Sequence, residues 1–132
     1  MTAISTILTD IWKVVKASPI DALNGGIYKR TRPTNSDLED CVISIIPGTA
    51  AKFIQNGALY VKIFYKALFI DNTYYEDSVN ALAKETLLIN LSAILLKNKN
   101  YSFDIASREV YTEYVEELHQ YYAILKINFV NV

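Results

Sequence analysis

"ALYVKIFYKALF", from Ala58 to Phe69, has the clearest periodicity in the chain. Its residues alternate between two sets, one with Leu59, Val61, Ile63, Tyr65 and Ala67, the other with Tyr60, Lys62, Phe64 and Lys66. An apolar set that alternates with a mixed one is typical of a β-strand with one buried face. At about 3.3 Å per residue this strand is longer than average, so we expect part of it to extend beyond the body of the domain.

Two shorter strands are predicted on the N-terminal side of this stretch. The first is Ile27–Arg32, and the second is the apolar run Cys41–Ile46. Their connection, Pro33–Asp40, has the composition of a loop. A second loop is expected over Pro47–Gly57, with room for a helical turn at Ala50–Ile54.

Helices are predicted on both sides of these strands. Apolar residues from Ile4 to Val15 recur at the spacing of an amphipathic helix. Ser18 and Pro19 then start one more turn, and we expect Asn24-Gly25-Gly26 to stop it because glycine accepts the left-handed conformation that ends helices. After a helix-start cluster at Asp71-Asn72-Thr73, the chain from about Tyr74 to Asn98 is predicted to form a long helix.

The last third of the chain is predicted to form a β-hairpin. The segment Ser107–Tyr122 fits a helix or a strand, and its many β-branched and aromatic residues favour the strand. Glu116-Glu117-Leu118 would then form the turn. Alternating apolar residues from Tyr121 to Phe129 indicate a long closing strand. The predicted fold class is α+β, an antiparallel sheet of about five strands with two helices packed on one face, in the order α-β-β-β-α-β-β.

Composition indicates one globular domain spanning residues 1–132. The net charge of −1 gives no general attraction to nucleic acid or to anionic membranes. The charge is uneven, because residues 41–70 contain three lysines and no acid, whereas residues 104–117 contain five acids and one arginine. Two such patches suit head-to-tail self-association, an internal contact or two solvated faces. With no basic leader at the start and no apolar run of ~18 residues, we expect folding in a cytoplasm.

The sequence offers no clear catalytic, cofactor or metal site. Glycines 25 and 26 precede a strand, whereas a phosphate-binding loop leads from a strand into a helix. The only histidine, His119, and the only cysteine, Cys41, have no supporting motif around them. Two acidic clusters lie in or beside expected loops or turns, where charge is usually solvated; they are Asp37, Glu39 and Asp40, and Glu113, Glu116 and Glu117. Neither has the spacing of a metal site. We therefore expect no enzyme and no cofactor.

The chain resembles bacteriophage tail-terminator proteins, also described as tail-completion or tail-to-head joining proteins. The resemblance rests on a turn "SPIDALNGG", the strands "GIYKRTRP", "CVISIIP" and "ALYVKIFYKALFI", the long helix, and the closing segment "HQYYAILKINFVNV". The most specific part is the block "GGIYKRTRPTN" followed by "DCVISIIPG".

This resemblance implies a mechanical role in a phage or prophage virion. Such subunits form a ring, usually of six copies, that caps the tail tube, ends its polymerisation and joins it to the head. The implied partners are further copies of the chain, the tail-tube protein and neck or connector proteins, with DNA only passing through the ring. No membrane and no small-molecule substrate is implied. The implied location is the virion tail or neck, assembled in the bacterial cytoplasm.

Within such a ring we expect the basic first strand to line the opening or to meet an acidic patch of a neighbour, although it could equally be an ordinary exposed strand. The long third strand and the C-terminal hairpin are expected to cross between subunits. The loops Pro33–Asp40 and Pro47–Gly57 are candidates for contact with the tail tube or the neck. Residues expected at contacts are Lys29, Arg30, Arg32, Lys62, Lys66, Glu113, Glu116 and Glu117. The alternative is a small cytoplasmic module, without catalytic activity, that binds protein or nucleic acid.

Overall fold

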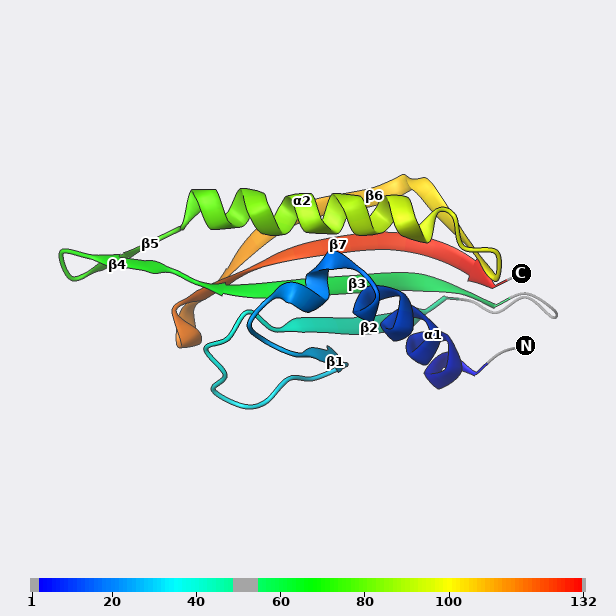
Figure 1. The fold of residues 1–132 in the computed structure, drawn as a ribbon, viewed down its shortest axis with the longest axis horizontal. Helices are drawn as coiled ribbons and strands as arrows, with labels where there is room; N and C mark the ends of the chain where they lie inside the picture. The colour runs from blue at the N-terminus through cyan, green and yellow to red at the C-terminus, as the bar shows by residue number, and fades with distance from the viewer. Residues whose placement is uncertain (1–2, 49–54, 132) are drawn as a thin grey trace.

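The computed structural model describes residues 3–48 and 55–131 and shows an α+β fold (Figure 1). Its main sheet has five strands in the order β1-β2-β3-β7-β6, and strands β4 and β5 form a separate two-stranded sheet. The helical elements are α1 (Ile4–Lys16), η1 (Pro19–Ala22), α2 (Ser78–Leu95) and η2 (Glu116–Leu118). The strands are β1 (Ile27–Lys29), β2 (Cys41–Pro47), β3 (Gln55–Lys66), β4 (Leu68–Ile70), β5 (Thr73–Tyr75), β6 (Tyr101–Val115) and β7 (Gln120–Asn131).

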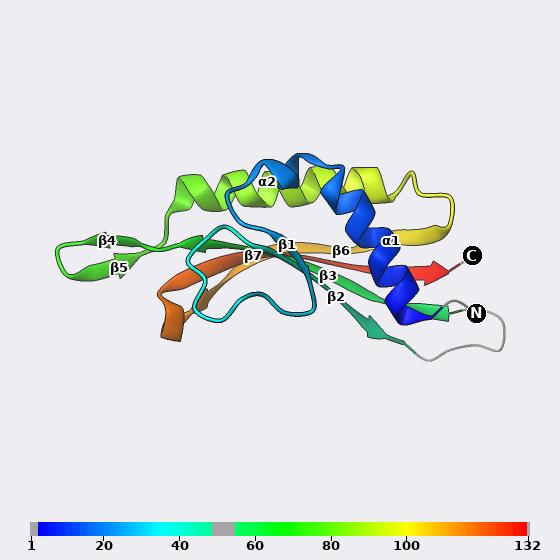
Figure 2. The same cartoon turned by 60° about the horizontal axis from the view of Figure 1, so that its bottom comes forward.

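Both helices lie on the same face of the main sheet (Figure 2). Helix α1 packs against β1 and β2, and α2 packs against β7, β6 and β3. No helix of the described residues lies on the opposite face, which we call the open face. Neither helix is long and apolar enough to span a membrane. The coarse prediction, two helices with a mostly antiparallel five-stranded sheet, is confirmed.

The core lies between the helices and the sheet because the strand register brings every apolar set to one face. Leu59 pairs with Ile127, Val61 with Leu125, and Ile63 with Ala123, and all six side chains are buried. Residues paired directly across antiparallel strands point to the same face, so the predicted alternation in β3 and β7 produces one continuous apolar surface. The helices cover it with further buried residues, which include Ile7, Leu8, Ile11, Val15, Leu88, Leu91 and Leu95.

The third strand is confirmed, but it ends at Lys66, and the chain beyond it was predicted incorrectly. Leu68 pairs with Tyr75, and Ile70 with Thr73, in a hairpin that projects past the end of the sheet (Figures 1 and 2). We call residues 68–75 the arm. Asp71 and Asn72, predicted to start the helix, form the two-residue turn instead, with φ of 50° and 62°. Asparagine and aspartate tolerate this left-handed conformation, which two-residue hairpin turns require.

Helix α2 therefore starts later than predicted. Asp77 is its N-cap, and its Oδ1 accepts a hydrogen bond from the backbone N–H of Asn80 at 3.1 Å. The cap satisfies a backbone donor that the first turn of a helix leaves free. The loop expected over Pro47–Gly57 was predicted too long, because Pro47 belongs to β2 and β3 starts at Gln55. The helical turn expected at Ala50–Ile54 falls outside the described residues.

The first strand also differs from the prediction. Strand β1 pairs parallel with β2 and ends at Lys29, because Arg30 has φ of 71° and turns the chain away. Neither glycine before it has a positive φ, so the helix-stop explanation for Asn24-Gly25-Gly26 is wrong. Gly25 is needed for space: a Cβ there would lie 2.5 Å from the carboxylate of Asp40.

The ambiguous segment Ser107–Tyr122 forms the end of β6, the turn η2 and the start of β7, so the favoured strand prediction is confirmed and the helix is not formed. Strand β6 starts much earlier than expected, at Tyr101, and its register against β7 shifts between Asp104 and Glu109. The predicted turn at residues 116–118 is present as η2, and His119 completes it with a left-handed φ of 51°.

Candidate functional site

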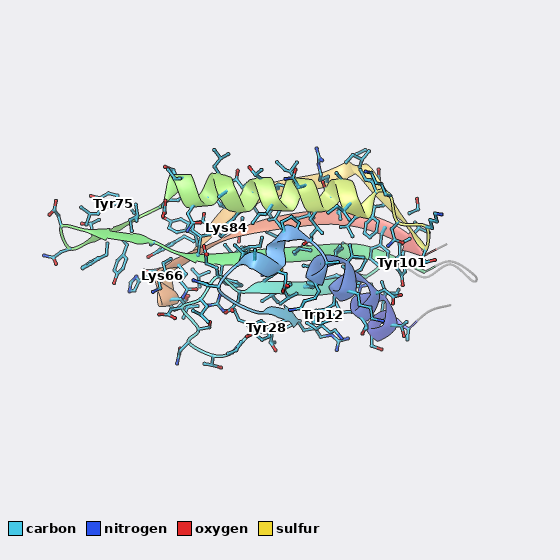
Figure 3. The ribbon with its side chains drawn as sticks, in the orientation of Figure 1. Trp12, Tyr28, Lys66, Tyr75, Lys84 and Tyr101 are labelled. Carbon is cyan, nitrogen blue, oxygen red and sulfur yellow. The ribbon has the colours of Figure 1, made fainter. Side chains whose placement is uncertain are left out.

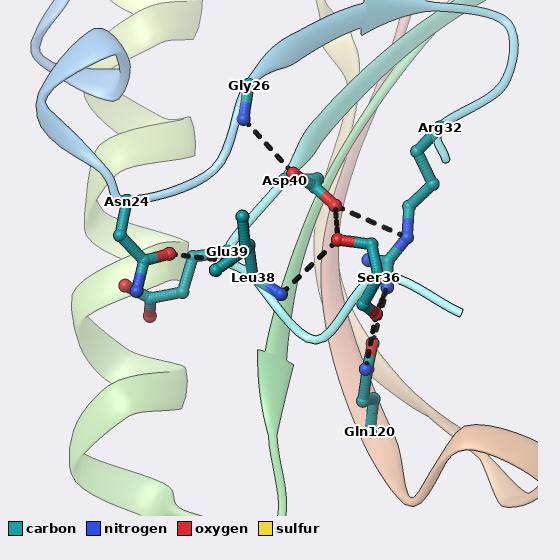
Figure 4. A network of polar contacts seen from close by, with 8 residues as sticks. All are labelled: Asn24, Gly26, Arg32, Ser36, Leu38, Glu39, Asp40 and Gln120. Atoms are coloured by element: carbon teal, nitrogen blue, oxygen red, sulfur yellow. Dashed lines mark hydrogen bonds and ion pairs between the residues drawn. The ribbon is translucent and has the colours of Figure 1, made fainter. Parts of the chain in front are cut away.

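A buried polar network joins β1, the loop 33–40 and β7 (Figure 4). Its centre is Asp40, which has no exposed surface. Its Oδ1 accepts from the backbone N–H of Gly26 at 3.0 Å, and its Oδ2 accepts from the hydroxyl of Ser36 at 2.5 Å. The Nε of Arg32 lies 3.6 Å from the same Oδ2, and Nη2 of Arg32 donates to Gln120 Oε1 at 2.8 Å. The network closes a loop against the start of the last strand.

Arg32 is thus placed inside the protein and not on a ring-lining surface. Its side chain is only 9% exposed, and its guanidinium lies 3.8 Å from the ring centre of Phe64. Burial lowers the pKa of Arg32, and the neighbouring Asp40 raises it in the opposite direction. The arginine remains charged because arginine has a pKa far above neutral. Its role in the structure is to hold the loop 33–40.

The other two acids of this loop also have basic partners. Asp37 pairs with Lys66 at 3.2 Å on the surface, and Glu39 pairs with Lys84 at 2.6 Å. Lys84 lies on α2 with only 6% of its side chain exposed (Figure 3). The expectation that this acidic cluster is solvated is therefore wrong for Glu39 and Asp40. Sequence analysis missed Lys84, although a single lysine inside an apolar helix is a signal for a buried partner.

The open face brings two of the predicted contact residues together. The Nζ of Lys62 lies 4.6 Å from the ring centre of Tyr122, whose hydroxyl donates to Glu113. Lys126 lies in the same way over Tyr60, at 5.8 Å. Strand β6 thus supplies the acid and β3 the lysine. One lysine of the basic patch, Lys62, and one acid of the acidic patch, Glu113, are therefore connected within the same chain through Tyr122. The connection is a cation–π contact on one side and a hydrogen bond on the other.

The remaining predicted residues lie on the surface. Lys29 donates to the hydroxyl of Thr9 at 3.0 Å and lies 5.6 Å from the ring centre of Trp12. Arg30 is exposed, and Glu116 and Glu117 are exposed on η2. Because β1 ends at Lys29, the strand expected over Ile27–Arg32 does not continue to Arg30 and Arg32.

Cys41 and His119 have environments that do not suit nucleophilic chemistry. Cys41 is 1% exposed, and burial, together with the nearby Asp40, raises the pKa of its thiol to about 12. A thiol with such a pKa supplies almost no thiolate at neutral pH. The ring of His119 stacks on Tyr74 with 3.9 Å between ring centres, and its Nδ1 lies 3.2 Å from the hydroxyl of Tyr114. His119 therefore supports the arm.

A row of aromatic rings connects the sheet to the arm. It runs from Tyr65 to Tyr121 (5.9 Å between centres) and to Tyr114 (4.8 Å), then through His119 to Tyr74 and Phe69 (4.7 Å). Stacked and tilted ring pairs at these distances are stabilising. These ring contacts fix the orientation of the arm relative to the sheet.

The arm nevertheless leaves large apolar side chains in solvent. Figure 3 shows it clear of α2 and the sheet, with Tyr75 labelled. The exposed fractions are 42% for Leu68, 58% for Phe69, 51% for Ile70, 41% for Tyr74 and 51% for Tyr75. Exposed apolar patches of this kind mark interaction sites, and an isolated two-stranded hairpin is only marginally stable in water. The arm is the most distinctive surface feature of the described residues.

The open edges of the sheet are less suited to contact. Strand β3 lies between β2 and β7, so most of both edges is already paired within the chain. Strand β6 is an edge strand, but it carries Glu109 and Glu113 and an irregular register after Asp104. Charges and bulges are the features that protect edge strands from pairing.

Comparison with known proteins adds no family to this geometry: no protein-family model matches the chain, and no curated protein matches it. Within the described residues, no group of three or more histidine, cysteine, aspartate or glutamate side chains is placed to hold a metal ion.

Three tyrosines with raised pKa values predict a loss of stability at alkaline pH. Burial, together with hydrogen bonds to acids, raises the pKa of Tyr65 and Tyr101, and that of Tyr122 to about 12. Unfolded tyrosine ionises near pH 10. The stabilisation is thus complete below pH ~10 and is lost as pH rises through the folded-state values. We expect the urea midpoint to be constant from pH ~8 to ~9 and to fall above pH ~10. In Tyr122→Phe the fall should be smaller; an equal fall would contradict the assignment.

Proposed function

We propose that this protein is a structural subunit of a phage tail. Copies of it form a ring that caps the tail tube, ends its polymerisation and joins it to the head or neck. The partners are further copies of the chain, the tail-tube protein and neck proteins, and the assembled location is the virion. The mode of action is contact between surfaces and not chemistry.

One observation carries this proposal, namely the apolar arm. A monomer that works alone gains nothing from placing five large apolar side chains in solvent at the end of a hairpin. A subunit that assembles covers them with a partner. The segments "GGIYKRTRP" and "CVISIIP" resemble tail-terminator proteins, and this resemblance suggests that the assembly is a ring on a phage tail.

The acids and lysines described above support a role without catalysis. Asp37, Glu39 and Asp40 are each paired with a basic side chain, and Cys41 is buried with a raised pKa. These four groups are therefore engaged in structural contacts or buried.

Molar mass in solution tests the proposal. We expect light scattering of the purified chain to show a mass that rises with protein concentration from the 15.0 kDa monomer toward a closed oligomer. Because the arm is apolar, the step should persist at high salt, where surface ion pairs are screened. A mass of one chain at every concentration would contradict self-assembly.

The open face favours a second candidate, binding of single-stranded nucleic acid. Tyr60 and Tyr122 lie on neighbouring strands with Lys62 and Lys126 beside them. Rings and lysines on one sheet face form the kind of platform on which bases stack. This candidate predicts retention on immobilised single-stranded DNA that weakens steeply with salt and is lost in Lys62→Ala. Retention that does not depend on Lys62 would exclude it.

A further inference from the structure

Helix α2 has an apolar outer surface that no described part of its own chain covers. Beyond Ser78, the exposed positions of α2 are Val79, Leu82, Ala83, Thr86, Ile89, Asn90, Ala93 and Ile94, which we call the outer stripe. Val79 is 81% exposed, Leu82 66% and Ile89 44%. The stripe contains no charged residue, whereas the exposed side of a surface helix is normally charged or polar. An exposed helix surface with this many apolar side chains is expected to be covered by a partner.

The arm and the outer stripe cannot meet within one chain. The arm leaves the sheet at the N-terminal end of α2 and points away from the helix in both views (Figures 1 and 2). The stripe faces away from the sheet. Two unlike apolar surfaces on one molecule, which cannot cover each other, fit a head-to-tail contact between two copies.

Charge favours the same contact. The arm and the residues that join it to α2 contain Asp71, Glu76 and Asp77 and no basic residue. The opposite end of α2 is followed by exposed Lys97 and Lys99, with no acid before Asp104. An arm that enters at the C-terminal end of a neighbouring α2 places Glu76 and Asp77, at its base, beside these lysines, while Lys66 on the other side of the base is paired with Asp37. It also brings the C-terminus of one α2 toward the N-terminus of the next, which helix dipoles favour.

We propose that the arm of one copy docks on the outer stripe of α2 of a second copy. Its tip points toward the N-terminus of that helix, and its base lies near Lys97 and Lys99. The three-residue strands span roughly 10 Å, which covers about seven residues of a helix. Counted back from Lys97, the tip of the arm reaches about Asn90, so the contact covers the C-terminal half of the stripe, with Ile89 beside the tip. This inference rests on the proposed self-assembly and names the surfaces that carry it.

Charge substitutions on the two surfaces test the contact. We expect Ile70→Glu on the arm and Ile89→Glu on the stripe each to raise the concentration needed for assembly at least about thirty-fold, as for central residues of interfaces. Thr6→Glu, on the exposed side of α1, adds the same charge and should leave the concentration needed for assembly unchanged. Circular dichroism of the dilute variants should match the original chain, because all three positions are exposed.

Disulfide trapping identifies the partner surface. In chains with Thr73→Cys at the tip of the arm, mixed with chains carrying Asn90→Cys on the stripe, oxidation should give a covalent dimer. Either chain alone should give none, because the native Cys41 is buried. Covalent dimers from Asn90→Cys alone would indicate an α2–α2 contact and overturn the proposal.

The outcomes separate this inference from the proposed function. If the original chain assembles and either glutamate variant assembles equally well, the arm–stripe contact is wrong while self-assembly remains. If the original chain never assembles, both are wrong. Loss of assembly in the stripe variant but not in the arm variant would assign the stripe to another partner surface and also overturn the inference.

Discussion

Replacing Asp40 with alanine should destabilise the protein by about 3–5 kcal/mol, the range for removal of one partner of a buried ion pair. Asp40 is fully buried and accepts hydrogen bonds from Gly26 and Ser36. Its loss leaves the guanidinium of Arg32, which is 9% exposed, without its carboxylate. The loop 33–40 would then lose its connection to β1. The measurement is the free energy of unfolding in urea.

Asp37→Ala is the matched control, since it removes the same type of residue from the same loop. The ion pair of Asp37 with Lys66 is more than 60% exposed on both sides. Such pairs contribute at most about 1 kcal/mol. If the two variants lose equal stability, or if Asp40→Ala unfolds at the original urea concentration, the network does not hold the loop as described.

Leu125→Ala should cost about 2–5 kcal/mol, the range for truncation of a fully buried leucine. Leu125 lies in β7, between Val61 on β3 and Val110 on β6, and has no exposed surface. The surrounding strands and α2 cannot close the cavity completely. Leu38→Ala makes the same change at a side chain that is 45% exposed, and should cost less than about 1 kcal/mol. An equal loss of unfolding free energy in both variants would contradict the assignment of Leu125 to the core.

The strands in which apolar and polar residues alternate strictly could be predicted from sequence. The strands of the arm, which lack this alternation, could not. Apolar residues every second position between Leu59 and Tyr65, and between Tyr121 and Phe129, defined β3 and β7 because one face of each is buried. The arm was missed because its residues are apolar on both faces, so no period marks it. Its turn, Asp71-Asn72, also has the composition of a helix start.

The polar network could not be predicted because its members are far apart in the sequence. Arg32 meets Gln120 across 88 residues, and only the completed sheet brings them together. Read locally, Arg32 belongs to a basic run with Lys29 and Arg30. The left-handed backbone at Arg30 separates the three, so that only the first two remain on the surface.

The two exposed apolar surfaces, the arm and the outer stripe of α2, were also predicted only in part. The sequence predicted one long strand that projects beyond the domain, whereas the projecting part is a separate hairpin, the arm, in which β4 pairs with β5. The sequence did not indicate that Val79 and Leu82 on α2 would be exposed, because apolar residues in a predicted helix are expected to pack against a core. Exposure of an apolar helix face depends on where the neighbouring elements lie, which a local pattern does not contain.

Electron microscopy combined with native mass spectrometry of the purified chain tests the central claim most directly. At concentrations where the mass has stopped rising, we predict closed rings with a central opening and a single dominant mass. The resemblance to tail terminators sets the expected mass at six times the 15.0 kDa chain. A closed ring of one size would support a subunit that caps a tube. Single chains at every concentration, or open filaments of variable length, would contradict it.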